Sequence, residues 1–203
     1  ERLELMERLE PLSLLGVVVV CDVGDRMQME ALCRTTTWAR GLLHTAGVEI
    51  EQLLTEIDSF VMGAVFASKT VAASHIHSSS GQLVADAMVL HSSIAAAFGC
   101  RRQASSAAAN SALDSLALLR RFCGLAASSL QSPNVRMEGW GRNTRVRRPG
   151  WSLGFEQYAA CLSELLAWHF GVHLLVPAEY ALVGAENENL AAITQERFVR
   201  FSS

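Results

Sequence analysis

The sequence has 203 residues, a length that suits one domain, with 50% hydrophobic and 18% charged residues. No run approaches the roughly 20 apolar residues that span a bilayer, which argues against a transmembrane protein. The net charge of −3 is unevenly spread, with −6 on residues 1–60, +7 on 61–150 and −4 on 151–203. Ordinary domains carry about 25% charged residues, so this low value suggests that a protein partner or another copy covers part of the surface.

The cysteines predict a reducing environment. Five are present, an odd number without close motif spacing: Cys21, Cys33, Cys100, Cys123 and Cys161. This pattern is typical of reduced thiols packed as small apolar groups. We therefore predict an intracellular reducing compartment (cytoplasm, nucleus or organelle matrix) rather than secretion. The first residue is Glu, so an N-terminal targeting segment removed from the protein is compatible with the sequence.

Helical periodicity dominates the first half of the chain. Apolar residues at helical spacing predict helices over residues 2–9, 25–45 and 48–74, and Asp25 is the expected N-cap of the second. Between the first two, residues 14–21 are continuous and β-branched, which indicates a short buried strand or the apolar end of a helix. A serine tract that ends at Gly81 follows the third helix.

The second half predicts three more helices, over residues 82–98, 105–129 and 153–172, with Ser152 as the N-cap of the last. Residues 174–203 form a less regular tail with short extended pieces. The fold class predicted from these elements is mainly α: an antiparallel helical bundle of four to six helices with a few short extended segments. Residues 1–203 are expected to form a single helical domain.

Residues 134–151 form a loop rich in Arg, Trp and Gly between two predicted helices. Guanidinium groups bind carboxylates and phosphates in a bidentate way, and tryptophan faces stack on bases. The loop therefore predicts a site for an anionic partner, either an acidic protein surface or nucleic acid. A solvated loop without a ligand is the remaining interpretation. The candidate binding residues are Arg136, Trp140, Arg142, Arg145, Arg147, Arg148 and Trp151.

Histidine pairs are weaker candidates for chemistry. His169 and His173 would share a helix face at a spacing that can hold a metal, but Gly171 between them indicates the end of the helix. His75 and His77 have no nearby acid or cysteine to complete a site. The sequence contains no glycine-rich phosphate loop and no cysteine in a recognisable active-site context. We therefore predict no catalytic residue, no bound metal and no cofactor.

Together these patterns predict a non-enzymatic structural or assembly protein, such as a subunit of a viral or organellar complex. It would self-associate or dock on an acidic protein surface through the arginine-rich loop. The first alternative is a nucleic-acid-binding coat, nucleocapsid or ribonucleoprotein subunit. The second alternative is a small metal-dependent enzyme that uses His169 and His173. The expected partner is accordingly a protein, either another copy or a different chain, with nucleic acid as the alternative.

Overall fold

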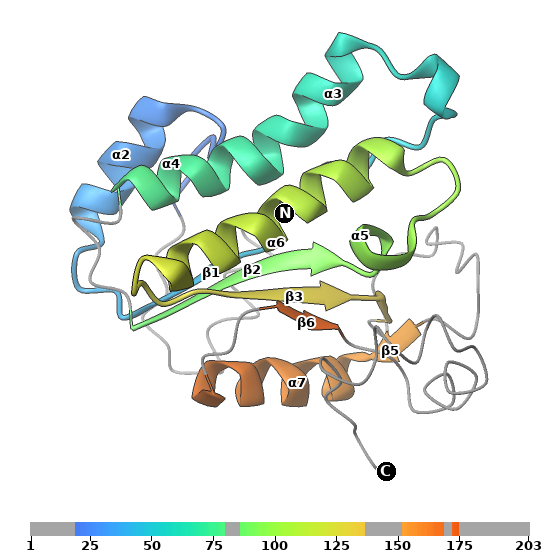
Figure 1. Ribbon diagram of the computed structural model, residues 1–203. Helices are drawn as coiled ribbons and strands as arrows, with labels where there is room; N and C mark the ends of the chain where they lie inside the picture. The colour runs from blue at the N-terminus through green and yellow to red at the C-terminus, as the bar shows by residue number, and fades with distance from the viewer. Residues whose placement is uncertain (1–18, 80–85, 137–151, 169–171, 175–203) are drawn as a thin grey trace.

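The computed structural model describes residues 19–79, 86–136, 152–168 and 172–174. A four-stranded parallel sheet in the order β1-β2-β3-β6 lies at the centre of these residues (Figure 1). Its strands are β1 (Gly41–His44), β2 (Ala87–Ser93), β3 (Ser128–Ser132) and β6 (Val172–Leu174). A second, two-stranded sheet pairs β4 (Asn134–Arg136) with β5 (Ser152–Gly154), also in parallel.

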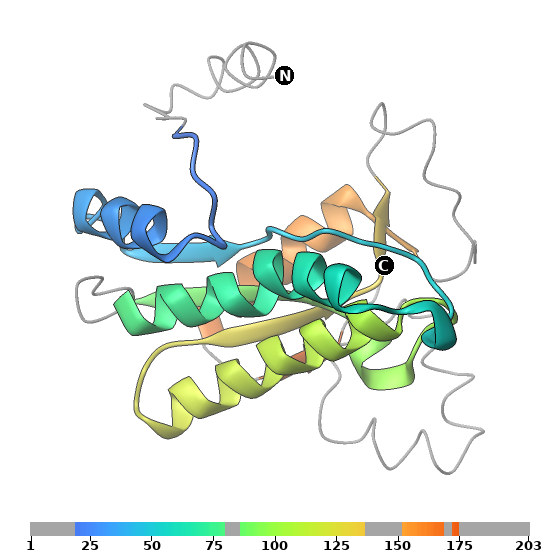
Figure 2. The same ribbon diagram turned by 90° about the horizontal axis from the view of Figure 1, so that it is seen from above.

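Helices cover both faces of the larger sheet. They are α2 (Arg26–Thr35), α3 (Ser59–Phe66), α4 (Ala72–Ser79), α5 (Ala95–Phe98), α6 (Ala104–Phe122) and α7 (Phe155–Trp168). A 3-10 turn, η2 (Leu54–Glu56), precedes α3, and a π-helix, η3 (Ala67–Val71), joins α3 to α4. The views in Figures 1 and 2 place α3, α4 and α6 on one side of the sheet, and Figure 1 shows α7 on the other. This α/β arrangement around a parallel sheet corrects the prediction of a mainly α helical bundle.

Each face of the sheet has its own apolar core. Met88 and Leu90 of β2 pack on one side with Leu113 of α6. Val89, between them in the sequence, packs on the other side with Cys161 of α7. Successive side chains of a strand point to opposite faces, so β2 contributes to both cores. A strand buried on both faces has a continuous apolar run instead of an alternating pattern.

Three strands lie where the spacing of apolar residues predicted helix. β1 falls at the end of the predicted helix 25–45 and β2 lies inside 82–98, while β3 begins at the last two residues of 105–129. The run Met88–Leu90 fits both a helical stripe and a buried strand, and periodicity alone does not separate the two. The predicted helices 105–129 and 153–172 correspond to α6 and α7. Ser152 lies in β5 and does not cap α7.

The predicted helix 48–74 is loop and the short 3-10 turn η2 as far as Asp58, and a continuous helix begins only after it. The Asp58 carboxylate accepts the Val61 N–H at 2.8 Å and caps α3. The helix then passes through η3, where the backbone follows i to i+5 hydrogen bonding, before it continues as α4. This π-helix places Lys69 against α6.

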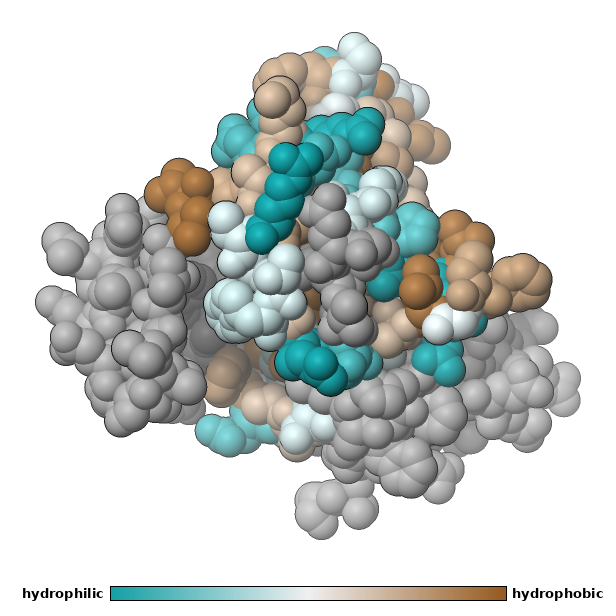
Figure 3. Space-filling model, turned by 90° about the vertical axis from the view of Figure 1, so that its left-hand side faces the viewer, coloured by the Kyte–Doolittle hydropathy of each residue, from teal (hydrophilic) through white to brown (hydrophobic). Residues whose placement is uncertain are grey.

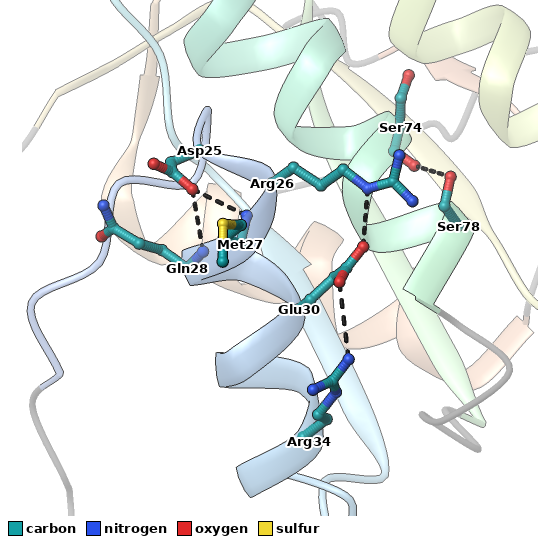
Figure 4. Close-up of polar contacts among 8 residues, drawn as sticks. All are labelled: Asp25, Arg26, Met27, Gln28, Glu30, Arg34, Ser74 and Ser78. Atoms are coloured by element: carbon teal, nitrogen blue, oxygen red, sulfur yellow. Dashed lines mark hydrogen bonds and ion pairs between the residues drawn. The ribbon is translucent and has the colours of Figure 1, made fainter.

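The start of α2 agrees with the sequence. The Asp25 carboxylate accepts the N–H groups of Met27 and Gln28 at 2.8 and 3.1 Å, as expected of an N-cap. Figure 4 shows Glu30 between Arg26, at 2.7 Å, and Arg34, at 3.7 Å, with α4 alongside. These ion pairs are exposed, so each contributes little to stability.

The surface at the end of the molecule where the strands of the larger sheet begin contains an apolar cavity but few groups suited to catalysis. Figure 3 shows apolar and hydrophilic side chains mixed over this surface. An apolar cavity of about 170 Å³ lies between α2 and β1, and its lining residues are Met29, Leu32, Cys33, Thr36, Ala39, Gly41 and Leu42. Within the described ranges, every helix is too short or too polar to cross a membrane.

Candidate active site

Four polar side chains meet at the carboxyl ends of β1 and β2. His44 ends β1, Ser92 lies near the end of β2, Lys69 comes from η3 and Asn110 comes from α6. All four are buried, with exposed fractions of 4%, 2%, 6% and 0% respectively. In open parallel α/β sheets, ligands bind outside the carboxyl ends of the strands. This cluster is therefore the candidate active site.

The centre of the site is the contact between Lys69 and Asn110. The Lys69 ammonium donates to Asn110 Oδ1 at 3.1 Å, and the Ser92 hydroxyl donates to the Asn110 carbonyl at 3.3 Å. Burial lowers the pKa of Lys69 below its ordinary value, and the charge of Glu49 offsets part of that effect. The site thus contains a lysine that releases its proton more readily than a lysine in water.

The π-helix η3 is tied to its neighbours at three successive residues. Ser68 Oγ accepts the Val48 N–H at 3.0 Å, which holds the loop after β1. The Lys69 carbonyl bonds His44 Nε2 at 3.0 Å, and the Thr70 hydroxyl donates to a backbone carbonyl of α6 at 3.2 Å. π-Turns inside helices are frequent at functional sites. Here the turn connects β1 with α6 and carries the lysine between them.

Two buried polar atoms of α6 have no hydrogen-bond partner within the described residues. They are Ser106 Oγ and Asn110 Nδ2. Ser106 and Asn110 are one turn apart on α6, so their side chains share a face of the helix. An ammonium and an amide N–H are donors, and a hydroxyl can also donate. Buried donors are normally satisfied, so this set fits an oxygen acceptor such as a carbonyl oxygen.

Gly47 allows the backbone to pass close to the lysine. A Cβ at this position would lie 2.9 Å from Lys69 Cε and 3.0 Å from Nζ. We expect Gly47→Ala to push the amine away from Asn110 and to make it several-fold more reactive towards acylation, since a displaced lysine is more exposed. Lys69 is the only lysine in the sequence, so peptide mapping after acylation reports on this amine.

Gly63→Ala is the matched control for that experiment, because a Cβ on Gly63 meets nothing within 4 Å. The acylation rate of Lys69 should be unchanged in this variant. Equal rates in the two variants would show that Gly47 does not shape the lysine site.

Most of the sequence-predicted binding residues lie outside the described residues. Arg136 is the last residue of β4. The remaining six fall within 137–151, which the structure does not describe: Trp140, Arg142, Arg145, Arg147, Arg148 and Trp151. An anionic partner at this loop stays a prediction.

The structure describes His75, His77 and His173 of the two histidine pairs. His173 lies in β6 and not on a helix, and His169 is outside the described residues. His77 Nδ1 contacts Arg120 at 3.0 Å. In the part of the chain that the structure describes, no three His, Cys, Asp or Glu side chains gather as metal ligands.

One feature of the sequence indicated this site, although it matches no short catalytic motif. Lys69 is the single lysine beside sixteen arginines, and it lies among apolar and small residues of a helix. Lysines are almost never fully buried unless paired, so a lone lysine in such a stretch indicates a dedicated partner. Neither Asn110 nor His44 carried a comparable signal.

Comparison with known protein families matches residues 2–136 to the KR domain, and this match covers more than half of the chain. The chain belongs to the KR domain family. Its parallel sheet and the position of the lysine cluster at the carboxyl ends of the strands agree with that assignment.

The curated relatives of this KR domain are bacterial polyketide synthases. A phenolphthiocerol synthesis polyketide synthase of Mycobacterium bovis is 38% identical over 119 residues, which are 57% of this chain and 6% of the synthase. The erythronolide synthase EryA2 of Saccharopolyspora erythraea is 34% identical over 142 residues, which are 68% of this chain and 4% of the synthase. The chain therefore spans only a small part of each synthase.

Solved ketoreductases share the fold of this KR domain. A-type ketoreductases from a modular polyketide synthase align with a TM-score of 0.77 and 28% identity, covering 98% of this chain and 43% of that chain. The first ketoreductase of the tylosin polyketide synthase aligns with a TM-score of 0.79 and 25% identity, covering 92% and 42% respectively. The chain thus spans less than half the length of these structures.

These comparisons correct the functional predictions. The relatives of the KR domain are enzymes, so the prediction of a non-enzymatic structural or assembly protein in a viral or organellar complex is wrong. The nucleic-acid-binding coat or ribonucleoprotein subunit and the metal-dependent enzyme using His169 and His173 are wrong for the same reason. The arginine loop attracted the functional interpretation because its charge is visible in sequence, whereas the lysine cluster forms only in the fold.

Proposed function

We propose that this KR domain supplies the ketone-binding and proton-donating part of a ketoreductase site, with Lys69 at its centre. The observation that carries the proposal is the buried Lys69 ammonium, bonded to Asn110 Oδ1 at the carboxyl edge of a parallel sheet. The substrate class is a ketone of a polyketide chain, because the similar solved structures are ketoreductases of polyketide synthases. The product is the corresponding alcohol.

Reduction of a ketone adds a hydride to the carbonyl carbon and a proton to its oxygen, and a nicotinamide cofactor supplies the hydride in such enzymes. At this cluster the Lys69 ammonium is the group able to release a proton, since serine hydroxyls and the Asn110 amide are far weaker acids. Its lowered pKa improves it as a general acid. The Lys69 ammonium therefore donates its proton to the carbonyl oxygen, which the unpaired donors of Ser106 and Asn110 hold in place.

The described residues do not fit the pyrophosphate of a nicotinamide cofactor. Pyrophosphate binding needs a glycine-rich turn that leads from a strand directly into the N-terminus of a helix. The loop after β1 instead runs from Thr45 to Asp58, and the Asp58 carboxylate that caps α3 would repel a phosphate. After β2 the chain enters α5, a single short turn. We therefore assign to the described residues the ketone and its proton alone.

The proposal is tested with the purified protein at its full natural length, supplied with NADPH and a ketone. Lys69→Met is expected to lower kcat/KM by about a hundredfold or more, because general acid catalysis contributes ~10²–10⁴-fold. Lys69→Arg should be similarly impaired, since a guanidinium does not release its proton. NADPH absorbance and mass spectrometry of the alcohol measure the rate.

Arg101→Met, which removes an exposed cation in the turn before α6, is the control and should retain the full rate. A wild-type protein that reduces no ketone, or a Lys69→Met variant as fast as wild type, would refute the proposed function.

We infer that the protein works inside the cell. The relatives are synthases of bacteria, which supports the predicted intracellular location and favours the bacterial cytoplasm over a nucleus or an organelle. None of the five cysteines takes part in a disulfide, which is compatible with a reducing compartment.

A further inference from the structure

The position of Lys69 depends on a contact from β1 as well as on Asn110. His44 is the last residue of β1, and its Nε2 lies 3.0 Å from the Lys69 carbonyl in buried surroundings. The same carbonyl also receives the Ala72 N–H at the end of the π-helix. Lys69 is thus held at both ends, by β1 at its backbone and by α6 at its amine.

The chemistry of this contact fixes the state of the histidine. A carbonyl oxygen only accepts hydrogen bonds, so the ring must carry its hydrogen on Nε2. Burial lowers the pKa of His44, which keeps the ring neutral beside the Lys69 ammonium. A neutral donor therefore faces the backbone of the π-helix without adding a second positive charge.

The His44 hydrogen bond is important because its acceptor belongs to a π-helix. Its wider turn is less regular than an α-helix, and it persists where the surroundings stabilise it. A change of the turn to α-helical geometry would rotate Lys69 relative to α6 and remove its amine from Asn110 Oδ1. The His44 bond acts on the residue whose rotation would break the site.

We propose that His44 is a positioning residue, whose ring N–H holds the Lys69 carbonyl and thereby keeps the π-turn in the geometry that directs the lysine amine to Asn110. The effect of this role on catalysis rests on the proposed function, whereas the effect on the lysine itself does not. His44 is not expected to touch the ketone.

The single lysine of the chain permits a direct test. In protein labelled with [ε-¹³C]lysine, the side-chain resonance that Lys69→Met removes belongs to Lys69, and its pH titration reports the pKa of that residue. His44→Phe keeps a ring but loses the donor, and His44→Gln loses the ring but keeps an N–H donor. We expect His44→Phe to raise the pKa of Lys69 by about one unit or more, because the released amine reaches water. His44→Gln should stay within a few tenths of wild type.

Thr70→Val is the matched control, because it removes a different hydrogen bond of η3 that does not involve Lys69. Its lysine resonance should titrate as in wild type. An unchanged pKa in His44→Phe, or equal shifts in His44→Phe and His44→Gln, would overturn the inference. Backbone amide spectra establish that each variant is folded, and His44→Leu replaces His44→Phe if the latter is not.

An activity measurement separates this inference from the proposed function. If the protein reduces ketones, kcat should fall in His44→Phe while KM stays nearly constant, and His44→Gln should recover most of the loss. If the lysine resonance responds as expected but no ketone is reduced by wild type, the role of His44 stands and the proposed function fails.

Discussion

Replacement of Asn110 by leucine is expected to lower the free energy of unfolding by about 3 kcal/mol at pH 7. The Asn110 side chain is fully buried, and its Oδ1 accepts the Lys69 ammonium at 3.1 Å. Leucine has a similar volume but no acceptor, so the variant leaves a buried cation without its hydrogen bond. Urea unfolding of wild type and variant at pH 7 measures the difference.

The double variant Lys69→Met/Asn110→Leu should regain most of that loss, because both partners are then apolar. Asn134→Leu is the control, since Asn134 is exposed on β4 and its replacement should change stability by less than about 0.5 kcal/mol. Lys69 can also avoid the cost by releasing its proton, so the loss in Asn110→Leu should shrink as the pH approaches 10. A double variant as unstable as the single one would contradict the expected coupling.

Acid is expected to destabilise wild type more than His91→Phe, by about 3 kcal/mol between pH 7 and pH 4. Burial lowers the pKa of His91 from 6.5 to about 4, with smaller contributions from the charges of Lys69 and His44. Below pH 6.5 the unfolded chain gains a proton that the folded protein does not take up. The stabilisation is therefore complete above pH 6.5 and is lost progressively as the pH falls to about 4.

Unfolding measured at several pH values in this window tests the expectation. The His91 ring lies 5.5 Å from the Tyr158 ring at an angle of 57°, and phenylalanine preserves a ring at that contact. Burial also lowers the pKa of His44, so His91→Phe should keep a weaker slope in the same direction. Tyr158→Phe should retain the full acid sensitivity. Parallel stability curves for wild type and His91→Phe would show that His91 takes up its proton in the folded state.

Local signals allowed part of the fold to be predicted from the sequence. The N-cap at Asp25 follows from a side chain that bonds N–H groups two and three residues away. α6 and α7 were located because their apolar faces repeat at helical spacing over many residues. The residues that identify such an element all lie within one short stretch of the chain.

The strands could not be identified from local sequence in this way. β2 owes its conformation to β1 and β3 on its two edges and to cores on both faces, and none of these is adjacent in sequence. Residues 41–44 and 128–132 are short segments at the ends of strongly helical patterns, so the helix signal extended over them. Tertiary pairing overrode local periodicity at each of these places.

The site was hidden for the same reason. Lys69 lies 25 residues from His44 and 41 residues from Asn110 along the chain, so no short motif records their contact. The chemistry became visible only when the crossovers between parallel strands brought three separate elements to one edge of the sheet. The charge of the arginine loop, by contrast, is dense in sequence and drew the interpretation towards binding.

The π-helix also bears on how the length of this helix can vary. Each α-helical residue turns the chain by about 100°, and a π-turn takes about one residue more than an α-turn to complete the same rotation. If one residue of η3 were deleted and the turn became α-helical, α3 and α4 would keep nearly the same rotational phase. Val61, Val65 and Ile76, which are buried, would therefore still face the core. The residue that would lose its position is Lys69, so the length of η3 is constrained by the lysine site and not by the core.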